Sequence, residues 1–267
     1  MSLTPEQRSE RRLRASALPR PLLELFRTAA DRTHTLVGAV GVFLIAGFVV
    51  AVTGTVLFAE LAEHVRAGGT TAFDDAVLTW LGTQHTPLLD TIMLEFTAIG
   101  TGSVVLMIAG ISGMFLYLTR HKYSALLLLV STAGGIALNA VLKLGFHRPR
   151  PHIIEWGTQA VSSSFPSGHA MNAAIVYGTV AYLAARLQKR LRWKIATLVT
   201  ALILIAGTCL SRVYLGVHYP TDVAAGVVIG LAWAGLCMAA LESLQILAMR
   251  RAPEILESEE PPPDASD

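Results

Sequence analysis

Long runs of apolar residues are the feature that most constrains what this chain can fold into. The first run extends from about Leu36 to Phe58. A helix needs about 20 mostly apolar residues to cross the hydrocarbon core of a bilayer. A secretory signal peptide would have a shorter apolar region nearer the start of the chain. The run therefore predicts an uncleaved membrane helix.

Five further apolar stretches follow, and together they predict an all-α fold, a bundle of six transmembrane helices. Composition agrees, because only 15% of the residues are charged, whereas a soluble domain carries about 25%. Residues 60–100 are mixed in polarity and predict short interfacial helices between the first and second crossings. The predicted crossings cover residues 36–58, 103–118, 123–146, 167–187, 195–210 and 222–248.

The two ends of the chain differ from the middle. Residues 1–35 hold seven arginines and predict a basic arm, either lying on the membrane surface or solvated. Residues 36–250 form the predicted membrane domain. Residues 251–267 contain three consecutive prolines and several acidic residues and predict a disordered tail.

Basic residues predict the orientation. With six crossings, 16 of the 21 Lys and Arg residues fall on the side that holds both termini. By the positive-inside rule this side is the cytoplasm. The sequence therefore predicts an integral protein of the cell or inner membrane with both termini cytoplasmic.

Three polar segments stand at predicted helix ends: residues 143–151, 166–169 and 211–222. Alternating crossings place all three on the extracytoplasmic face. The cations Lys143, Arg150 and Arg212 should cluster there, and the only acids expected near them are Glu155 and Asp222. Cations without acidic partners favour an anion such as phosphate. A neighbouring arginine, Arg148, is expected to be a solvated rim residue.

The middle segment also favours an anion. Pro166 suits a chain entering a helix, and Ser167 is a good residue for the N-cap. The helix that follows would direct backbone N–H groups and the positive end of its dipole at the site. Gly168 would let a phosphate approach the backbone without a side chain in the way.

Two histidines supply possible reactive groups. His218 could attack phosphorus if its ring were neutral and aimed, and Asp222 could hydrogen-bond one ring nitrogen to fix the tautomer. His169 could protonate the leaving oxygen and later activate water. His64, His85, His121 and His152 are interpreted as surface or interface residues.

These segments resemble the three-part signature of the type 2 phosphatidic acid phosphatase superfamily, the lipid phosphate phosphatases. The resemblance implies a phosphohistidine on His218, with Asp222 as its partner and His169 as general acid. It implies phosphate binding by Lys143, Arg150, Ser167, Gly168 and Arg212, and no metal or other cofactor. Its fixed positions are Lys143, Arg150 and Pro151; Pro166, Ser167, Gly168 and His169; and Ser211, Arg212, His218 and Asp222.

The family's substrates are lipid phosphates and diphosphates, such as phosphatidic acid, phosphatidylglycerol phosphate and polyprenyl diphosphates. The sequence does not choose among them, and a lipid-to-lipid phosphotransferase would use the same residues. A transporter or scaffold is disfavoured, because the polar residues stand at helix ends rather than in the middle of the membrane. Net charge is only +2, which suggests no nucleic-acid partner. Cys209 and Cys237 lie in apolar runs and are interpreted as small packing residues.

Overall fold

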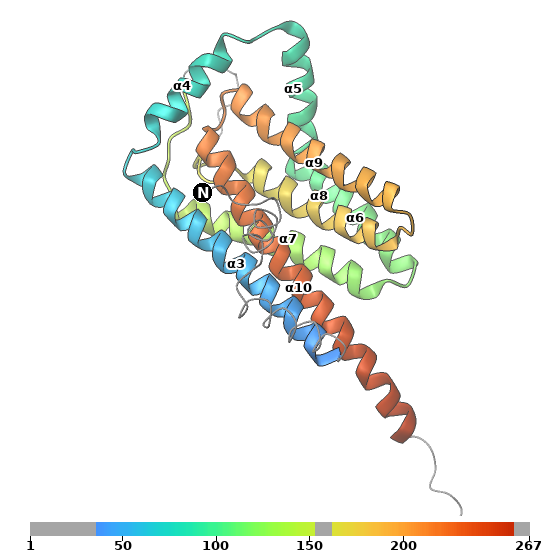
Figure 1. Cartoon of the computed structure of the whole chain (residues 1–267). Helices are drawn as coiled ribbons and strands as arrows, with labels where there is room; N and C mark the ends of the chain where they lie inside the picture. The colour runs from blue at the N-terminus through green and yellow to red at the C-terminus, as the bar shows by residue number, and fades with distance from the viewer. Residues whose placement is uncertain (1–35, 153–161, 259–267) are drawn as a thin grey trace, which may run out of the picture. The chain divides into compact units, whose positions relative to one another are not determined.

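The computed structural model describes residues 36–152 and 162–258, and these form α-helices without any strand (Figure 1). They divide into two compact units, and the candidate site lies entirely within the unit of residues 46–241. The all-α prediction is therefore confirmed for the described residues. The helices are α3 (Leu36–Arg66), α4 (Thr71–Gly82), α5 (Pro87–Ile99), α6 (Gly102–Leu118), α7 (Lys122–Gly145), α8 (Gly168–Leu187), α9 (Leu191–Tyr214) and α10 (Pro220–Ser258).

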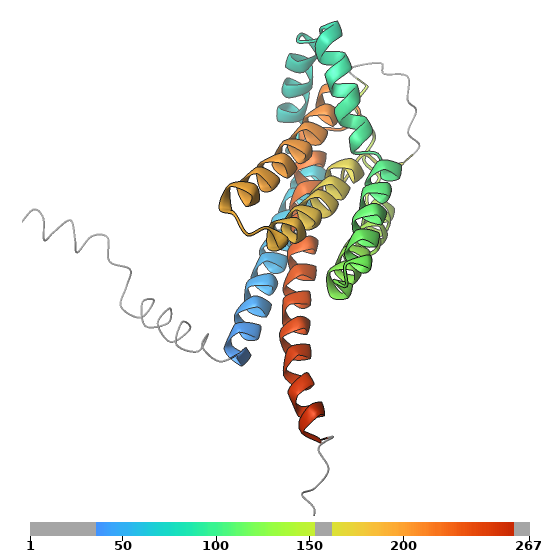
Figure 2. The same cartoon turned by 90° about the vertical axis from the view of Figure 1, so that its right-hand side faces the viewer.

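Several of these helices can cross a membrane. Among the described residues, four contain spans that are long and apolar enough, namely Leu44–Arg66, Lys122–Gly145, Leu191–Tyr214 and Pro220–Gln245. Helices α5 and α6 meet at a bend of 53° and would together make a fifth span (Figure 2). An integral membrane protein is thus supported. The number of six crossings and an interfacial location for α4 and α5 stay predictions.

Helix α8 matches the predicted fourth crossing in position, yet it is not among the apolar spans. The reason is its place in the bundle, where it packs against α6, α7 and α9. Half of its residues are buried, and many of them are alanine. A helix surrounded by protein can be built from small residues, because little of its surface meets lipid.

Glycines bring α10 unusually close to α8. A Cβ added to Gly226 would lie 2.6 Å from the Ser167 carbonyl oxygen, and one added to Gly230 would lie 2.9 Å from the Met171 carbonyl oxygen. Both distances are below van der Waals contact, so only glycine fits. These glycines permit close helix contact, which holds the start of α10 beside the start of α8.

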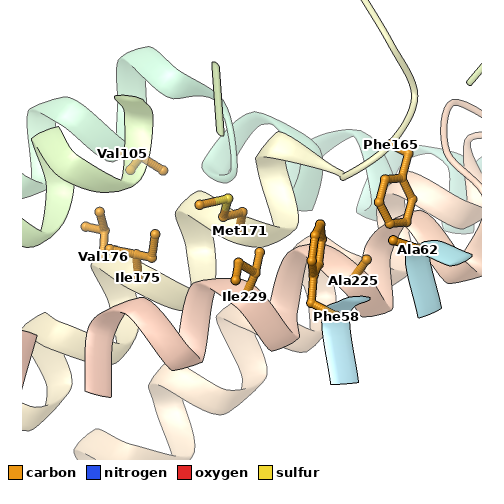
Figure 3. Packing of buried hydrophobic residues seen from close by; sticks show 9 residues of the cluster. All are labelled: Phe58, Ala62, Val105, Phe165, Met171, Ile175, Val176, Ala225 and Ile229. Atoms are coloured by element: carbon orange, nitrogen blue, oxygen red, sulfur yellow. The ribbon is translucent and has the colours of Figure 1, made fainter. Parts of the chain in front are cut away.

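An apolar cluster lies next to these helix starts (Figure 3). Phe165, which precedes α8, is fully buried in it. Its ring packs against Phe58 of α3 and Phe146, with ring centroids 5.5 and 4.8 Å apart. This packing anchors the short segment between Phe165 and α8. The cluster contains Phe58, Ala62, Val105, Phe165, Met171, Ile175, Val176, Ala225 and Ile229.

The outer boundaries differ from those expected. Helix α10 continues to Ser258, past residue 251, where the tail was predicted to begin. The basic arm of residues 1–35, Glu155 and residues 259–267 lie outside the described residues. The proposed division into arm, membrane domain and tail stays a prediction.

Candidate active site

The three polar segments meet at one end of the bundle. The Ser167 N–H at the start of α8 donates to the Asp222 carbonyl in α10, at 3.0 Å. The Arg150 guanidinium, beyond the end of α7, donates to the Val217 carbonyl at 2.9 Å. The His218 N–H donates to the Arg212 carbonyl of α9 at 3.2 Å. These bonds join residues that the sequence separates by as many as 67 positions, the interval from Arg150 to Val217.

Lys143, Arg150 and Arg212 form a group of like charges that act on one another, and we call this group the cationic pocket. Lys143 Nζ and Arg150 Nη2 lie 3.3 and 3.4 Å from the same Ser162 hydroxyl oxygen. Arg212 donates to the Thr97 hydroxyl, and its Nε is buried without a partner. No ion pair found among the described residues involves any of the three cations. Burial lowers the pKa of Arg150, which shows that holding this charge here is costly. An anion would offset that cost.

His218 lies beside this pocket with 2% of its surface exposed. Its Nε2 is 3.4 Å from Arg150 Nη1. Its Nδ1 is 3.3 Å from the Ser164 hydroxyl and 3.6 Å from Asp222 Oδ2. Burial lowers the pKa of His218 to about 4, against the opposing effect of Asp222. The ring is therefore neutral near neutral pH, as a nitrogen nucleophile must be.

One expectation about His218 needs correction. A direct hydrogen bond from its ring to Asp222 was predicted, but 3.6 Å is too long for one. The Ser164 hydroxyl lies beside both groups, 3.3 Å from His218 Nδ1, and donates to Asp222 Oδ2 at 2.5 Å. The predicted pair is therefore close but is bridged by a third side chain.

The start of α8 faces the same pocket. Ser167 occupies the N-cap position, as predicted, but its side chain makes no cap hydrogen bond. Its hydroxyl oxygen is buried without a partner. The first N–H groups of a helix also have no acceptor within the helix. The hydroxyl and the N–H groups together offer donors to an anion.

Gly168 and His169 complete the predicted set. A Cβ at Gly168 would lie 3.1 Å from Asn139 Oδ1, so this glycine packs closely against α7. The His169 ring faces the α5–α6 bend, because a Cβ at Gly100 would lie 3.3 Å from its Cδ2. The charges of Arg212, Lys143 and Arg150 act on this ring, so it lies within range of the cationic pocket.

Beside the pocket lies a second charged group, which we call the carboxylate brace: Asp74, Arg148, Thr221 and Asp222. Arg148 donates to Asp222 Oδ1 at 2.6 Å and to Asp74 Oδ2 at 2.7 Å. Thr221 donates to Asp74 through its hydroxyl at 2.7 Å. Both carboxylates are fully buried, and Arg148 is 14% exposed. Burial acts to lower the pKa of Arg148, but the two carboxylates outweigh it and raise the pKa.

The brace overturns two expectations. Arg148 is a buried ion-pair partner rather than a solvated rim residue. The nearby acids also include Asp74, which the sequence argument did not consider. A signal for Asp74 existed, because it shares the buried face of α4 with Leu78 and Leu81. A carboxylate on an apolar face indicates a buried partner.

Ser164 and Thr97 were also missed. Thr97 accepts from Arg212 across 115 positions of sequence, and Ser164 reaches His218 across 54. Neither residue stands out by type or spacing, so no pattern in the sequence indicates either contact.

Comparisons with known proteins found one matching family model and one similar curated protein. The family model described as the PAP2 superfamily matches residues 124–245. Phosphatidylglycerophosphatase B of Bacillus subtilis (strain 168) is 33% identical over 180 residues, which cover 65% of this chain and 86% of that protein.

Two solved structures are similar as well. One is the crystal structure of a transmembrane PAP2 type phosphatidylglycerolphosphate phosphatase from Bacillus subtilis. It aligns with a TM-score of 0.66 and 31% identity over 72% of this chain and 96% of that one. The crystal structure of Aquifex aeolicus LpxE aligns with a TM-score of 0.48 and 24% identity over 65% of this chain and 95% of that one.

Proposed function

The chain belongs to the PAP2 superfamily, and from this premise we propose that it hydrolyses a lipid phosphate or diphosphate in the membrane through a phosphohistidine on His218. Phosphatidylglycerol phosphate is the first substrate to test, because the Bacillus subtilis relatives bear its name. The observation that carries the proposal is the position of His218 Nε2. This neutral nitrogen lies 3.4 Å from Arg150, one of three cations that take part in no ion pair among the described residues.

The proposed reaction has two steps. His218 Nε2 attacks phosphorus as the bond to the leaving oxygen breaks, and His169 donates a proton to that oxygen. His169 then takes a proton from water, which attacks the phosphohistidine. Inorganic phosphate leaves, and His218 is regenerated.

The phosphate itself would be held by groups whose hydrogen-bond donors are not all satisfied within the protein. The cationic pocket, the Ser167 hydroxyl and the N–H groups at Gly168 would bind its non-bridging oxygens. Charge builds up on these oxygens in the transition state, so fixed donors there lower the barrier. No metal is needed in this scheme. A chelator should leave activity intact, and loss of activity reversed by a divalent metal would contradict it.

The membrane arrangement is part of the proposal. We infer six crossings, with α8 buried among the other helices, both termini in the cytoplasm and the site at the outer surface. A membrane-impermeant thiol reagent applied to intact cells should label Gln84→Cys, near the site end, but not His121→Cys, at the other end. The reverse pattern would refute this orientation.

The nucleophile can be tested by replacing it. His218→Ala should abolish phosphate release, by at least the roughly thousandfold typical of a lost nucleophile, while the protein still purifies folded in detergent. The matched control is His121→Ala, because His121 is exposed and lies between α6 and α7, away from the site. The control should keep wild-type activity. Wild-type turnover by His218→Ala would refute the assignment.

A further inference from the structure

The Ser164 hydroxyl lies within hydrogen-bond distance of both the proposed nucleophile and its carboxylate. Its hydroxyl oxygen is 2.5 Å from Asp222 Oδ2 and 3.3 Å from His218 Nδ1. Ser164 and Asp222 are fully buried, and His218 is 2% exposed. The Ser164 N–H also donates to the Arg148 carbonyl at 2.9 Å, which holds its backbone in place. The hydroxyl and its two partners are thus buried together, and the Ser164 backbone is held by Arg148.

The partners of Asp222 decide where the protons lie. Arg148 donates to Oδ1 at 2.6 Å, and the Tyr219 N–H donates to Oδ2 at 2.9 Å. An ionised carboxylate accepts hydrogen bonds only. The Ser164 hydroxyl must therefore donate its one hydrogen to Asp222, and it presents a lone pair to His218.

The same logic fixes the His218 ring. Nδ1 faces that lone pair, so it carries the hydrogen and donates it to Ser164. A neutral imidazole has one hydrogen on its two nitrogens, so Nε2 is left bare. Nε2 is the nitrogen beside Arg150 and the cationic pocket. The chain of bonds runs from His218 through Ser164 to Asp222.

We propose that Ser164 is a positioning residue through which Asp222 selects the tautomer of His218 and aims Nε2 at the phosphorus atom. The inference rests on the proposed function, because it concerns the same nucleophile. It assigns to Ser164 the contact that a direct hydrogen bond from Asp222 would otherwise make. As positive charge grows on the ring during attack, the ionised Asp222 stabilises it, with the serine hydroxyl holding the ring and the carboxylate in place.

Removing the hydroxyl tests the proposal. Ser164→Ala should lower kcat by about 10- to 100-fold, the range for a hydrogen bond to a charged group, and leave KM little changed. Ser163→Ala is the matched control, because its hydroxyl bonds only to the Phe165 backbone among the described residues. The control should retain wild-type kcat. If Ser164→Ala does not fold, Ser164→Cys replaces it, since a thiol is similar in size but a weak donor and acceptor.

A double-mutant cycle separates positioning from simple packing. In an Asp222→Asn background, Ser164→Ala should cost less than about twofold, because groups that act as a unit are not additive. An equal loss in both backgrounds would assign Ser164 a packing role and overturn the proposal. Wild-type kcat in Ser164→Ala or Ser164→Cys would overturn it too. Neither result tests the assignment of His218 as nucleophile. The His218→Ala variant tests that assignment separately.

Discussion

Arg148 and Arg150 are two residues apart, yet they have opposite surroundings. Arg148 bridges two buried carboxylates in the brace. Arg150 contacts carbonyl and hydroxyl oxygens and the His218 ring, and none of the ion pairs seen in the described parts of the chain includes it. One guanidinium is neutralised by the protein, and the other is left for something else to neutralise.

The contrast shows that charged residues at this end of the bundle fall into two groups, one neutralised by ion pairs and one not. The brace is a closed ion pair, which fixes Asp222 and joins α4 to the start of α10. The cationic pocket is open, with three like charges held together at a cost that an anion would offset. His218 lies on the border, with Asp222 on one side and Arg150 on the other. Substituting each arginine in turn tests whether the two groups have these separate roles.

The largest expected effect is on stability. Arg148→Ala leaves two fully buried carboxylates without their common partner. Removing one partner of a buried ion pair costs about 3–5 kcal/mol, so we expect the free energy of unfolding in detergent to fall by that amount. Activity should be lost with it, because Asp222 loses its anchor. A wild-type melting temperature for this variant would show that the brace does not support the fold.

Arg150→Ala should have the reverse profile. It removes hydrogen bonds to Val217 and Ser162 but also relieves repulsion within the pocket. Stability should stay within about 1 kcal/mol of wild type. By contrast, kcat/KM should fall by about 10²–10³-fold, the usual cost of a lost transition-state donor. Phosphate or orthovanadate should raise the melting temperature of the wild type but not of this variant.

The two arginine variants can also contradict the division outright. Equal destabilisation by Arg148→Ala and Arg150→Ala would mean that both arginines are structural. Retained turnover by Arg150→Ala would mean that the pocket is not where the phosphate binds.

The sequence predicted the open pocket better than the closed brace. Lys143, Arg150 and Arg212 could be placed together because each stands at the end of an apolar run, and run length fixes where helices end. The all-α class and the positions of α7, α8 and α9 follow from the same signal. The resemblance then supplied roles for these residues at their own positions.

The sequence did not predict the carboxylate brace, because its contacts form only in the tertiary structure. Asp74 and Arg148 are 74 positions apart and belong to segments with no common motif. Short helices were predicted within residues 60–100, but no buried face was assigned to them, and in the structure Phe73 is 60% exposed while Asp74 is fully buried. The position of the Asp74 carboxylate on the apolar side of helix α4 indicated a buried partner, but it did not identify which residue the partner is. Ser164 and Thr97 offered no clue, because a serine or threonine is unremarkable in a polar segment.

The smallest expected effect is a pH dependence of stability that arises from His218, which lies between the carboxylate brace and the cationic pocket. Burial lowers its pKa to about 4, compared with about 6.5 in the unfolded chain. As pH falls below about 6.5, the unfolded state takes up a proton that the folded state refuses. Stability is therefore complete above this pH and is lost progressively down to about pH 4. Because one pKa unit is worth about 1.4 kcal/mol, the loss is on the order of 3 kcal/mol.

The difference between wild type and His218→Gln isolates this contribution, since all other groups titrate in both proteins. Melting temperatures measured from about pH 7.5 to 4 should fall more steeply for the wild type than for the variant. The steeper slope means that burial and the charges of Arg150 and Arg212 keep the ring neutral and outweigh the opposing effect of Asp222. Parallel curves would show that His218 is as easily protonated in the folded protein as in the unfolded chain. Its Nε2 would then carry a proton at mildly acidic pH and could not attack phosphorus there.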